Sequence, residues 1–152
     1  MAKVDDLDMT ILSELAADAN ISVPRISKKI NVNSSVVYSR IKRLIKRKLI
    51  ERFTIVVNDR ELGYTVKALT GINMDTKLRD HVIEELFKVP EVREISEVTG
   101  RFDILVTIYA KNLDEMHRLI SEKLGRIEGV QRSESFIEMK RTTKPMPYKP
   151  VK

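Results

Sequence analysis

Apolar side chains in the first fifty residues recur at helical spacing. Leu7, Ile11 and Leu15 lie four residues apart, with Leu12 beside them, and predict a helix over residues 5–17. Acidic residues at the start of this segment suit the positive end of a helix dipole. The chain therefore opens with an amphipathic helix.

A second helix is expected to begin at Ser22, a residue type that often caps a helix. Its inward-facing apolar side chains are Val23, Ile26 and Ile30. The tripeptide Asn31-Val32-Asn33 then ends this helix. Asn31 tolerates the left-handed conformation that a tight turn needs, Val32 fills the core, and Asn33 caps the next helix.

A third helix is predicted over residues 34–48. Its core-facing side chains are Val37, Ile41, Leu44 and Ile45. Residues 53–58 then predict a strand pair, with a turn at Asp59 and Arg60. Three helices followed by a strand pair are typical of a winged helix-turn-helix.

Leu62-Gly63-Tyr64 marks the passage into a second module with a different rhythm. The predicted strands cover residues 66–74, 92–98, 102–110 and 130–140, and the predicted helices cover 78–89 and 113–127. Pro90 and Gly129 end the two helices. The order β-α-β-β-α-β predicts a ferredoxin-like sandwich, and the whole chain is expected to have an α+β fold.

One sheet with both helices on one face leaves its other face open. On the strand at 102–110, one face carries Phe102, Ile104, Val106 and Ile108, and the other carries the apolar Leu105 and Tyr109. Leu69 on the first strand adds to that second face. An exposed apolar patch of this kind marks a partner surface, so a homodimer is expected.

Charge is distributed unevenly along the chain. The net formal charge is −4 over residues 1–20, +9 over 21–52 and +1 over 53–152. The middle segment holds ten Lys or Arg residues and one acid, Glu51. Such a block is the electrostatic footprint of a phosphate-contacting surface, although a solvated Lys-rich helix is the alternative.

The face of the third helix opposite its core side chains is polar at its start and basic further along. Short side chains let a helix backbone enter the major groove of double-stranded DNA, and basic ones contact phosphates. Val36 borders this face and suits a thymine methyl, whereas Tyr38 suits either a phosphate or half-buried packing. The expected DNA-contacting residues are Arg25, Lys28, Ser34, Ser35, Val36, Tyr38, Ser39, Arg40, Lys42, Arg43 and Lys46.

Composition excludes several classes of function. The chain has no cysteine, which excludes disulfides and thiolate chemistry, and its two histidines, His81 and His117, lie far apart among charged neighbours. No stretch approaches the roughly 20 apolar residues of a membrane span. The N-terminus lacks the apolar core of a signal peptide. We expect a cytoplasmic protein without metal or cofactor.

An enzyme is disfavoured too. The sequence shows no His–carboxylate pair at catalytic spacing and no phosphate-binding glycine loop.

These patterns together resemble the leucine-responsive/asparagine-synthetase-regulator (Lrp/AsnC) transcription factors of prokaryotes. The resemblance covers residues 4–139 and rests on Leu7-Asp8-x-x-Ile11-Leu12, Ser35-Val36-Val37-x-x-Arg40-Ile41-x-x-Leu44, Leu49-Ile50, Leu62-Gly63 and Thr99-Gly100-Arg101-Phe102-Asp103-Ile104. It implies a sheet-mediated dimer, higher oligomers such as a tetramer of dimers, and an amino-acid effector. Two departures are Lys48, where the family usually has glycine, and residues 144–150, a Pro/Lys-rich flexible tail expected to extend beyond the family pattern.

The resemblance implies an effector site at the loop of residues 99–103. The expected effector-binding residues are Thr99, Gly100, Arg101, Phe102, Asp103, Ser133 and Ser135, the two serines coming from a neighbouring subunit. Loop N–H groups and Arg101 suit a carboxylate, and Asp103 suits an ammonium. The alternative is purely structural, with Gly100 as a hairpin turn, Arg101 in solvent and Asp103 capping its own loop.

The sequence thus predicts four segments: a helix-turn-helix over 1–52, a wing and linker over 53–64, a ferredoxin-like module over 65–140 and a basic tail over 141–152. The expected function is sequence-specific transcription regulation tuned by an amino acid. An architectural DNA-compacting protein without effector is the alternative.

Overall fold

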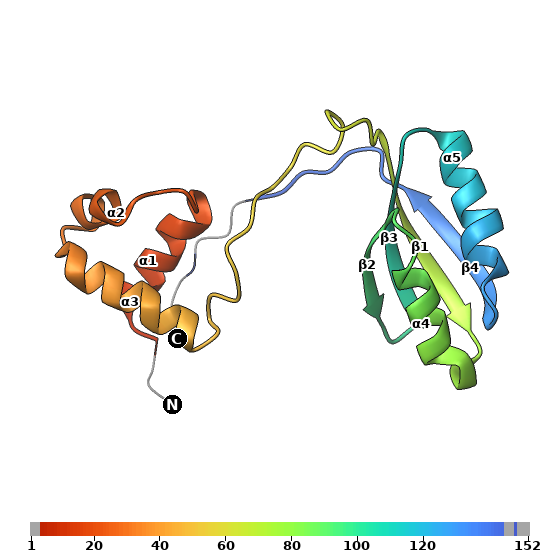
Figure 1. The fold of residues 1–152 in the computed structure, drawn as a ribbon, viewed down its shortest axis with the longest axis horizontal. Coiled ribbons are helices and arrows are strands. Elements are labelled where there is room, and N and C mark those ends of the chain that lie inside the picture. Colours follow the sequence, from red (N-terminus) through yellow and green to blue (C-terminus); the bar gives the residue numbers. More distant parts are fainter. Residues whose placement is uncertain (1–3, 145–147, 149–152) are drawn as a thin grey trace. The chain divides into compact units, whose positions relative to one another are not determined.

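The chain folds into two units, which Figure 1 shows as a group of helices and a sheet with its own helices. The computed structural model describes residues 4–144 and 148. The helical unit consists of Met1–Val56 together with Thr142–Lys152, and the sheet unit consists of Val57–Arg141. The chain therefore passes between the units twice.

Three helices form the helical unit. They are α1 (Asp6–Ala17), α2 (Val23–Ile30) and α3 (Ser34–Lys46). Their buried core consists of Ile11, Leu15, Ile26 and Val37, with Val32 packed against it. The predicted helix-turn-helix is confirmed.

Local backbone geometry explains the turn and the helix ends. Asn31 adopts the left-handed conformation, with φ of 52°, and the Asn33 side chain accepts a hydrogen bond from the backbone N–H of Ser35. Lys48 is also left-handed, with φ of 56°, so the end of α3 adopts its turn with a lysine where the resemblance implies a glycine. Ser22 occupies the N-cap of α2, as predicted, although its side chain makes no cap hydrogen bond.

The helix α3 ends at Lys46, close to the expected end near Lys48. Two expectations for this region are wrong. Ile45 is 41% exposed instead of core-facing. Residues 53–58 form no strand, and Val56 is fully exposed. A strand is stable only when its N–H and C=O groups find a neighbouring strand, and this segment has none within the described chain.

The sheet unit is the predicted ferredoxin-like fold. Its strands are β1 (Val66–Met74), β2 (Val92–Glu97), β3 (Ile104–Ala110) and β4 (Val130–Ile137). They pair antiparallel in the order β2-β3-β1-β4. The helical elements are η1 (Thr76–Leu78), α4 (Arg79–Phe87), α5 (Leu113–Arg118), the π-helical η2 (Leu119–Lys123) and the 3-10 helical η3 (Leu124–Arg126).

The core of this unit lies between the sheet and its helices. Its strand side chains include Ala68, Ile72, Ile104, Val106 and Ile108, all fully buried. Leu86 of α4 and Met116 of α5 pack against them from the helix side.

Phe102 is an exception to the predicted alternation of β3. A Cβ built on Gly71 would lie 2.4–2.6 Å from three atoms of the Phe102 ring. Gly71 alternates with the inward-facing Ile72, so the ring covers Gly71 on the outer face of the sheet. The expectation that Phe102 shares a face with Ile104 is wrong, because residues 101–103 precede the regular strand.

Candidate functional site

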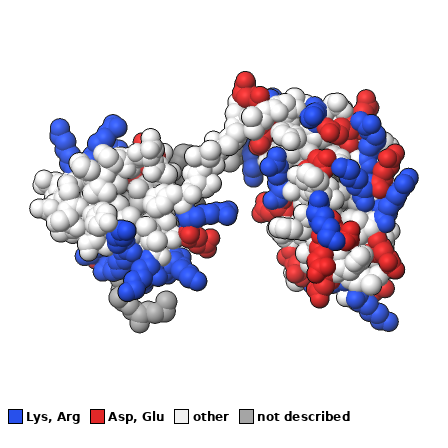
Figure 2. All heavy atoms as spheres, viewed as in Figure 1, with Lys and Arg blue, Asp and Glu red and all other residues white. Residues whose placement is uncertain are grey.

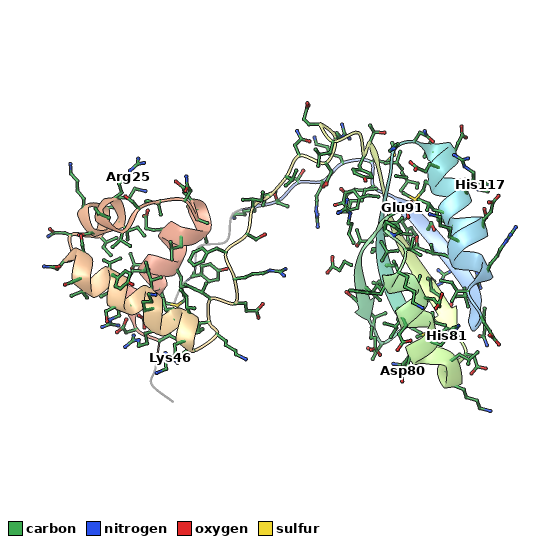
Figure 3. The ribbon with its side chains drawn as sticks, in the orientation of Figure 1. Arg25, Lys46, Asp80, His81, Glu91 and His117 are labelled. Carbon is green, nitrogen blue, oxygen red and sulfur yellow. The ribbon has the colours of Figure 1, made fainter. Side chains whose placement is uncertain are left out.

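The outward face of α3 presents the predicted DNA-contacting side chains to solvent. Ser35, Val36, Tyr38, Ser39, Lys42 and Lys46 are all exposed, and Ser34 is half-buried. Figure 2 shows Lys and Arg side chains gathered over α3, whereas acidic and basic side chains are interspersed on the sheet unit. Arg25 on α2 is exposed and projects from the unit, as does Lys46 (Figure 3).

Two arginines of α3 are instead held by a buried carboxylate. Asp8 of α1 is fully buried, and its carboxylate accepts hydrogen bonds from Arg40 Nη1 at 3.2 Å and from Arg43 Nη2 at 2.5 Å. A charge with no exposure is stable only when it is paired and hydrogen-bonded, as it is here. Asp8 therefore fastens α3 to α1 and orients both guanidinium groups.

Asp5 completes this cluster at the surface. It caps α1 by accepting from the Asp8 backbone N–H at 2.9 Å, and it also pairs with Arg40. The hydrogen bond from Arg40 holds the pKa of the Asp5 carboxyl below its ordinary value. For the same reason Asp5 raises the pKa of Arg40.

The remaining bases of the helical unit divide into free and paired groups. Lys29 pairs with Glu14 at 2.7 Å, so it is partly neutralised. Lys42 lies 5.5 Å from the centre of the Tyr38 ring, which suits a cation–π contact on the exposed face. The bases with no carboxylate partner among the described residues include Arg25, Lys28, Lys42 and Lys46.

Sequence reasoning missed the role of Asp8. An acid in the first turn of a helix was explained by the helix dipole alone. The available signal was its position one residue after Leu7, on the same face as Ile11 and Leu15, which places a carboxylate in the apolar stripe.

The loop of residues 99–103 closes the hairpin between β2 and β3. Asp103 Oδ2 accepts from the Met74 backbone N–H at 2.9 Å, and the Arg101 guanidinium donates to Glu134 Oε2 at 2.6 Å. Gly100 has φ of +135°, a conformation that favours glycine. Asp103 and Arg101 thus have structural partners on β1 and β4, whereas the structural alternative had placed Asp103 as a cap of its own loop and Arg101 in solvent.

Hydrogen-bonding capacity nevertheless remains in this loop. Within the part of the chain that the structure describes, the backbone N–H groups of Thr99, Gly100 and Arg101 donate no hydrogen bond. Asp103 Oδ1 likewise accepts none there. The loop offers donors for a carboxylate and one acceptor for an ammonium.

Ser133 and Ser135 do not join this loop within one chain. They lie on β4 opposite Ile72 and Thr70, on the helix-facing side of the sheet, and Ser135 Oγ lies 2.8 Å from Thr70 Oγ1. The Arg101–Glu134 pair lies on the other side of that strand. Their predicted contribution from a neighbouring subunit stays a prediction.

The outer face of the sheet carries the predicted apolar patch. Leu69 is 41% exposed and Phe136, directly opposite it on β4, is 50% exposed, while Leu105 and Tyr109 are half-buried. Lys67 and Arg93 lie 5.5 and 5.9 Å from the centre of the Tyr109 ring. The patch therefore has an aromatic centre with cations beside it.

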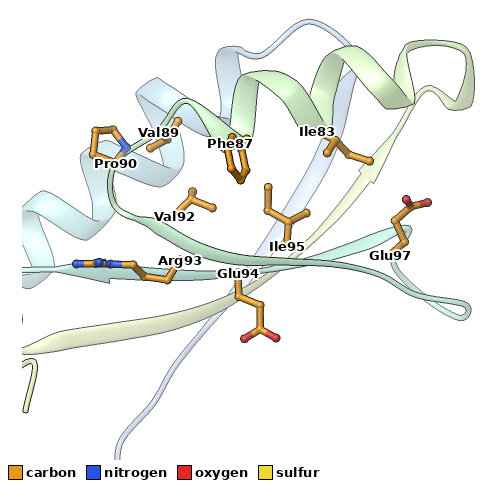
Figure 4. Close-up of a pocket in the computed structure, with 9 residues that line it drawn as sticks. All are labelled: Ile83, Phe87, Val89, Pro90, Val92, Arg93, Glu94, Ile95 and Glu97. Atoms are coloured by element: carbon orange, nitrogen blue, oxygen red, sulfur yellow. The ribbon is translucent and has the colours of Figure 1, made fainter. Parts of the chain in front are cut away.

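A separate groove of about 540 Å³ lies between α4 and the edge strand β2. Figure 4 shows Phe87 and Ile83 of α4 above Ile95 and Val92 of β2, with Glu97 at one end. None of the loop residues 99–103 lines it. Sequence reasoning did not single out this groove, although Phe87 falls outside the apolar stripe of its helix.

Metal sites and membrane-spanning helices are not found among the described residues. No group of three or more His, Cys, Asp or Glu side chains there has the arrangement of a metal site. His81 and His117 are both exposed on their helices (Figure 3). No described helix is long and apolar enough to cross a membrane.

Sequence models of two known domains match the chain. The AsnC-type helix-turn-helix domain matches residues 4–45, and the Lrp/AsnC ligand binding domain matches residues 67–148. The second match includes most of the Pro/Lys-rich tail. The expectation that residues 144–150 extend beyond the family pattern is therefore wrong as far as residue 148.

Relatives align along most of the chain. An uncharacterised HTH-type transcriptional regulator of Pyrococcus horikoshii is 36% identical over 89% of this chain and 85% of its own length. The HTH-type transcriptional regulator FL11 of Pyrococcus furiosus is 35% identical over 90% of both chains.

Solved structures share the fold. AsnC of E. coli superposes with a TM-score of 0.86 at 23% identity, covering 95% of this chain and 97% of its own. A transcriptional regulator of Neisseria meningitidis, solved as a complex with L-Met, gives 0.89 at 18% identity, covering 95% and 96%.

Proposed function

Because the chain belongs to the Lrp/AsnC family of transcriptional regulators, we propose that it binds double-stranded DNA in the cytoplasm as a dimer or larger assembly, and that a free amino acid tunes this binding. The family assignment establishes that the chain is a transcriptional regulator with a helix-turn-helix domain and a ligand-binding domain. The proposal concerns the identity of the effector, the assembly and the residues that contact DNA.

The exposed face of α3 is the observation that carries the DNA-binding part. Small side chains at its start, among them Ser35 and Ser39, let the helix approach base edges, with Val36 beside them. Lys42 and Lys46 lie further along, where they suit phosphates. Arg40 and Arg43 contribute mainly by fixing the angle of α3, since Asp8 already occupies part of each guanidinium.

The sheet unit supports the assembly part. Leu69, Phe136, Leu105 and Tyr109 place apolar and aromatic surface on the face that no helix covers. A two-fold pair of such faces would remove this surface from water. The dimer then presents two α3 helices, which suits a pseudo-palindromic DNA site.

The loop of residues 99–103 supports the effector part. A free amino acid presents a carboxylate and an ammonium a few ångströms apart. Unused N–H groups at Thr99, Gly100 and Arg101 suit the carboxylate, and Asp103 Oδ1 suits the ammonium. The Neisseria meningitidis structure, a complex of the same fold with L-Met, makes an amino acid the first class of ligand to test.

Selection from a pool of random duplexes tests the DNA-binding part. A regulator enriches one pseudo-palindromic sequence, whereas an architectural protein enriches none.

Calorimetric titration with each of the twenty amino acids tests the effector part. Asp103→Ala is expected to abolish the binding heat, because it removes the acceptor for the ammonium. DNA affinity without effector should stay within about twofold, because an effector shifts DNA binding only by its differential affinity for the two states and is absent from that measurement.

A matched control for the loop is Asp75→Ala. Asp75 also accepts a backbone N–H, from Lys77, but lies at η1 rather than at the hairpin. It should leave effector binding unchanged. If Asp103→Ala binds the amino acid as tightly as the parent chain, the site lies elsewhere in the protein.

A further inference from the structure

An apolar groove of about 890 Å³ lies on the helical unit, away from every predicted DNA-contacting side chain of the described chain. Its lining includes Met9, Leu12 and Ala16 of α1, with Leu49 and Phe53 from the segment after α3. Leu49 and Phe53 are 44% and 51% exposed, so one side of the groove is open to solvent. One of its lining residues, Tyr148, comes from the C-terminal segment.

Tyr148 is fastened to α1 through its backbone. Its N–H donates to Ser13 Oγ at 3.1 Å, and its C=O lies 3.2 Å from the same hydroxyl. The single hydroxyl proton of Ser13 is shared between this C=O and that of Met9, which lies at 3.0 Å. The Tyr148 side chain is 50% exposed, so about half of it is covered.

The charges of the two segments are compatible with this occupant. The exposed Asp6 and Asp18 have no basic partner among the described residues, and residues 140–152 hold five Lys or Arg and no acid. A segment with one aromatic residue suits an apolar groove, because an aromatic ring packs on apolar side chains while a tyrosine hydroxyl can remain in water.

The hydrogen bonds of Tyr148 to α1 give the chain a second connection between the two units, besides the one that follows α3. From Ile50, which packs on the helical core, sixteen residues lead to Val66 of β1. At full extension they span at most about 55 Å. From Glu138, whose N–H still donates to Lys67 of β1, ten residues lead to Tyr148, a span of at most about 35 Å. The second connection is therefore the shorter one.

We propose that the C-terminal segment is a strap: Tyr148 seats in the α1 groove of its own chain and ties the last strand of the sheet unit to the helical unit. This inference rests on the proposed function, in which a dimer must hold two α3 helices at the spacing of its DNA site. A second, shorter tether narrows the range of spacings that the two helical units sample.

A single tryptophan tests the seat without DNA. The chain has no tryptophan, so Tyr148→Trp and the control Thr143→Trp each introduce one. The Trp at 148 should have a lower acrylamide quenching constant than the Trp at 143, because about half of the residue at 148 is covered and its backbone is hydrogen-bonded to Ser13. Equal quenching at the two positions would overturn the proposal.

Two second-site changes identify the groove. Adding Ser13→Ala or Ala16→Glu to Tyr148→Trp should raise quenching to the level of Thr143→Trp. Thr10→Ala, which removes a similar hydroxyl bond from α1 to the backbone of Asp6, should not. Ala16 is exposed, so its replacement leaves the core intact. Unchanged quenching with Ala16→Glu would remove the α1 groove as the seat.

Cysteine pairing distinguishes this chain from a second copy as the source of the strap. The chain has no cysteine, so Ser13→Cys with Tyr148→Cys forms one new disulfide. An intrachain bond supports the strap, and a covalent dimer assigns the groove to the partner's segment instead. Ser13→Cys with Thr143→Cys is the control.

DNA binding supplies the functional readout. Tyr148→Ala should reduce by several-fold the preference for the correct half-site spacing over a spacing shifted by half a helical turn, while single half-site affinity stays unchanged. An unchanged preference contradicts the role of the strap. Failure of the parent chain to bind any DNA contradicts the proposed function instead, and leaves the quenching result interpretable.

Discussion

The buried carboxylate of Asp8 is expected to be the largest single polar contribution to the stability of the helical unit. Asp8→Ala removes both charge-assisted hydrogen bonds, to Arg40 at 3.2 Å and to Arg43 at 2.5 Å. Each such bond contributes about 1.5–3 kcal/mol, and breaking a buried ion pair costs about 3–5 kcal/mol. The two arginine side chains are 25% and 38% exposed, so water recovers part of this loss.

The expected destabilisation is therefore about 2–4 kcal/mol. Native-state hydrogen exchange on the full chain measures it, because peptides from α1 and α3 report the helical unit and peptides from β1 and β3 report the sheet unit. Only the first set should lose protection. Asp8→Asn keeps the side-chain volume and one acceptor, so it should lose about half as much and keep the unit folded.

Glu14→Ala is the matched control, since Glu14 is also an acid of α1 paired with a base, Lys29. That pair is 26% and 56% exposed and should contribute under about 1 kcal/mol. A double-mutant cycle of Asp8→Ala with Arg43→Ala should give a coupling energy of about 1–2 kcal/mol. The reasoning is refuted if Asp8→Ala costs no more than Glu14→Ala.

Three other outcomes are expected. Gly71→Ala places a methyl within 2.4–2.6 Å of the Phe102 ring and should destabilise the sheet unit by about 1–3 kcal/mol. Adding Phe102→Ala should restore part of the lost stability, and thermal melting measures both changes. Leu69→Glu should dissociate the dimer in sedimentation, whereas Leu113→Glu, at a leucine 61% exposed outside the outer sheet face, should leave it intact. Because the pKa of Asp5 is lowered, its pairing with Arg40 stabilises α1 fully above the ordinary pKa of 3.8 and is lost as pH falls through the lower folded value. Hydrogen-exchange protection of α1, measured as a function of pH, should fall in that acid range. Asp5→Asn should remove this pH dependence.

Periodicity predicted most of the fold because it reports burial. The strand β1 occupies the residues expected for it, and the turn at Asn31 and Asn33 has the backbone and cap that those residue types favour. Local patterns contain the information for both, since they depend on neighbours within a few residues.

The errors share a different physical origin. Residues 53–58 have strand composition, but a strand depends on a partner that a local pattern does not specify. Ile45 has the spacing of a core residue, yet it lies in the last turn of α3 and is 41% exposed. The pairing of Asp8 with Arg40 and Arg43 joins residues more than thirty positions apart.

The candidate sites were predicted only in part. Exposure of Ser35, Ser39, Lys42 and Lys46 followed from the helical period. The docking of Tyr148 on Ser13 was not foreseen, because a Pro/Lys-rich composition favours a flexible tail and conceals one specific contact.

The salt dependence of DNA binding tests the central claim most directly. Each neutralised phosphate contributes about −0.9 to the slope of log affinity against log salt concentration. Lys42→Ala with Lys46→Ala should weaken all duplexes alike and flatten the slope by about 1–2. Lys88→Ala with Lys123→Ala, which removes two bases of the sheet unit that pair with Glu85 and Glu91, should leave it unchanged. A flat salt dependence in the parent chain, or an unchanged slope without Lys42 and Lys46, would contradict the assignment of α3 as the DNA-contacting helix.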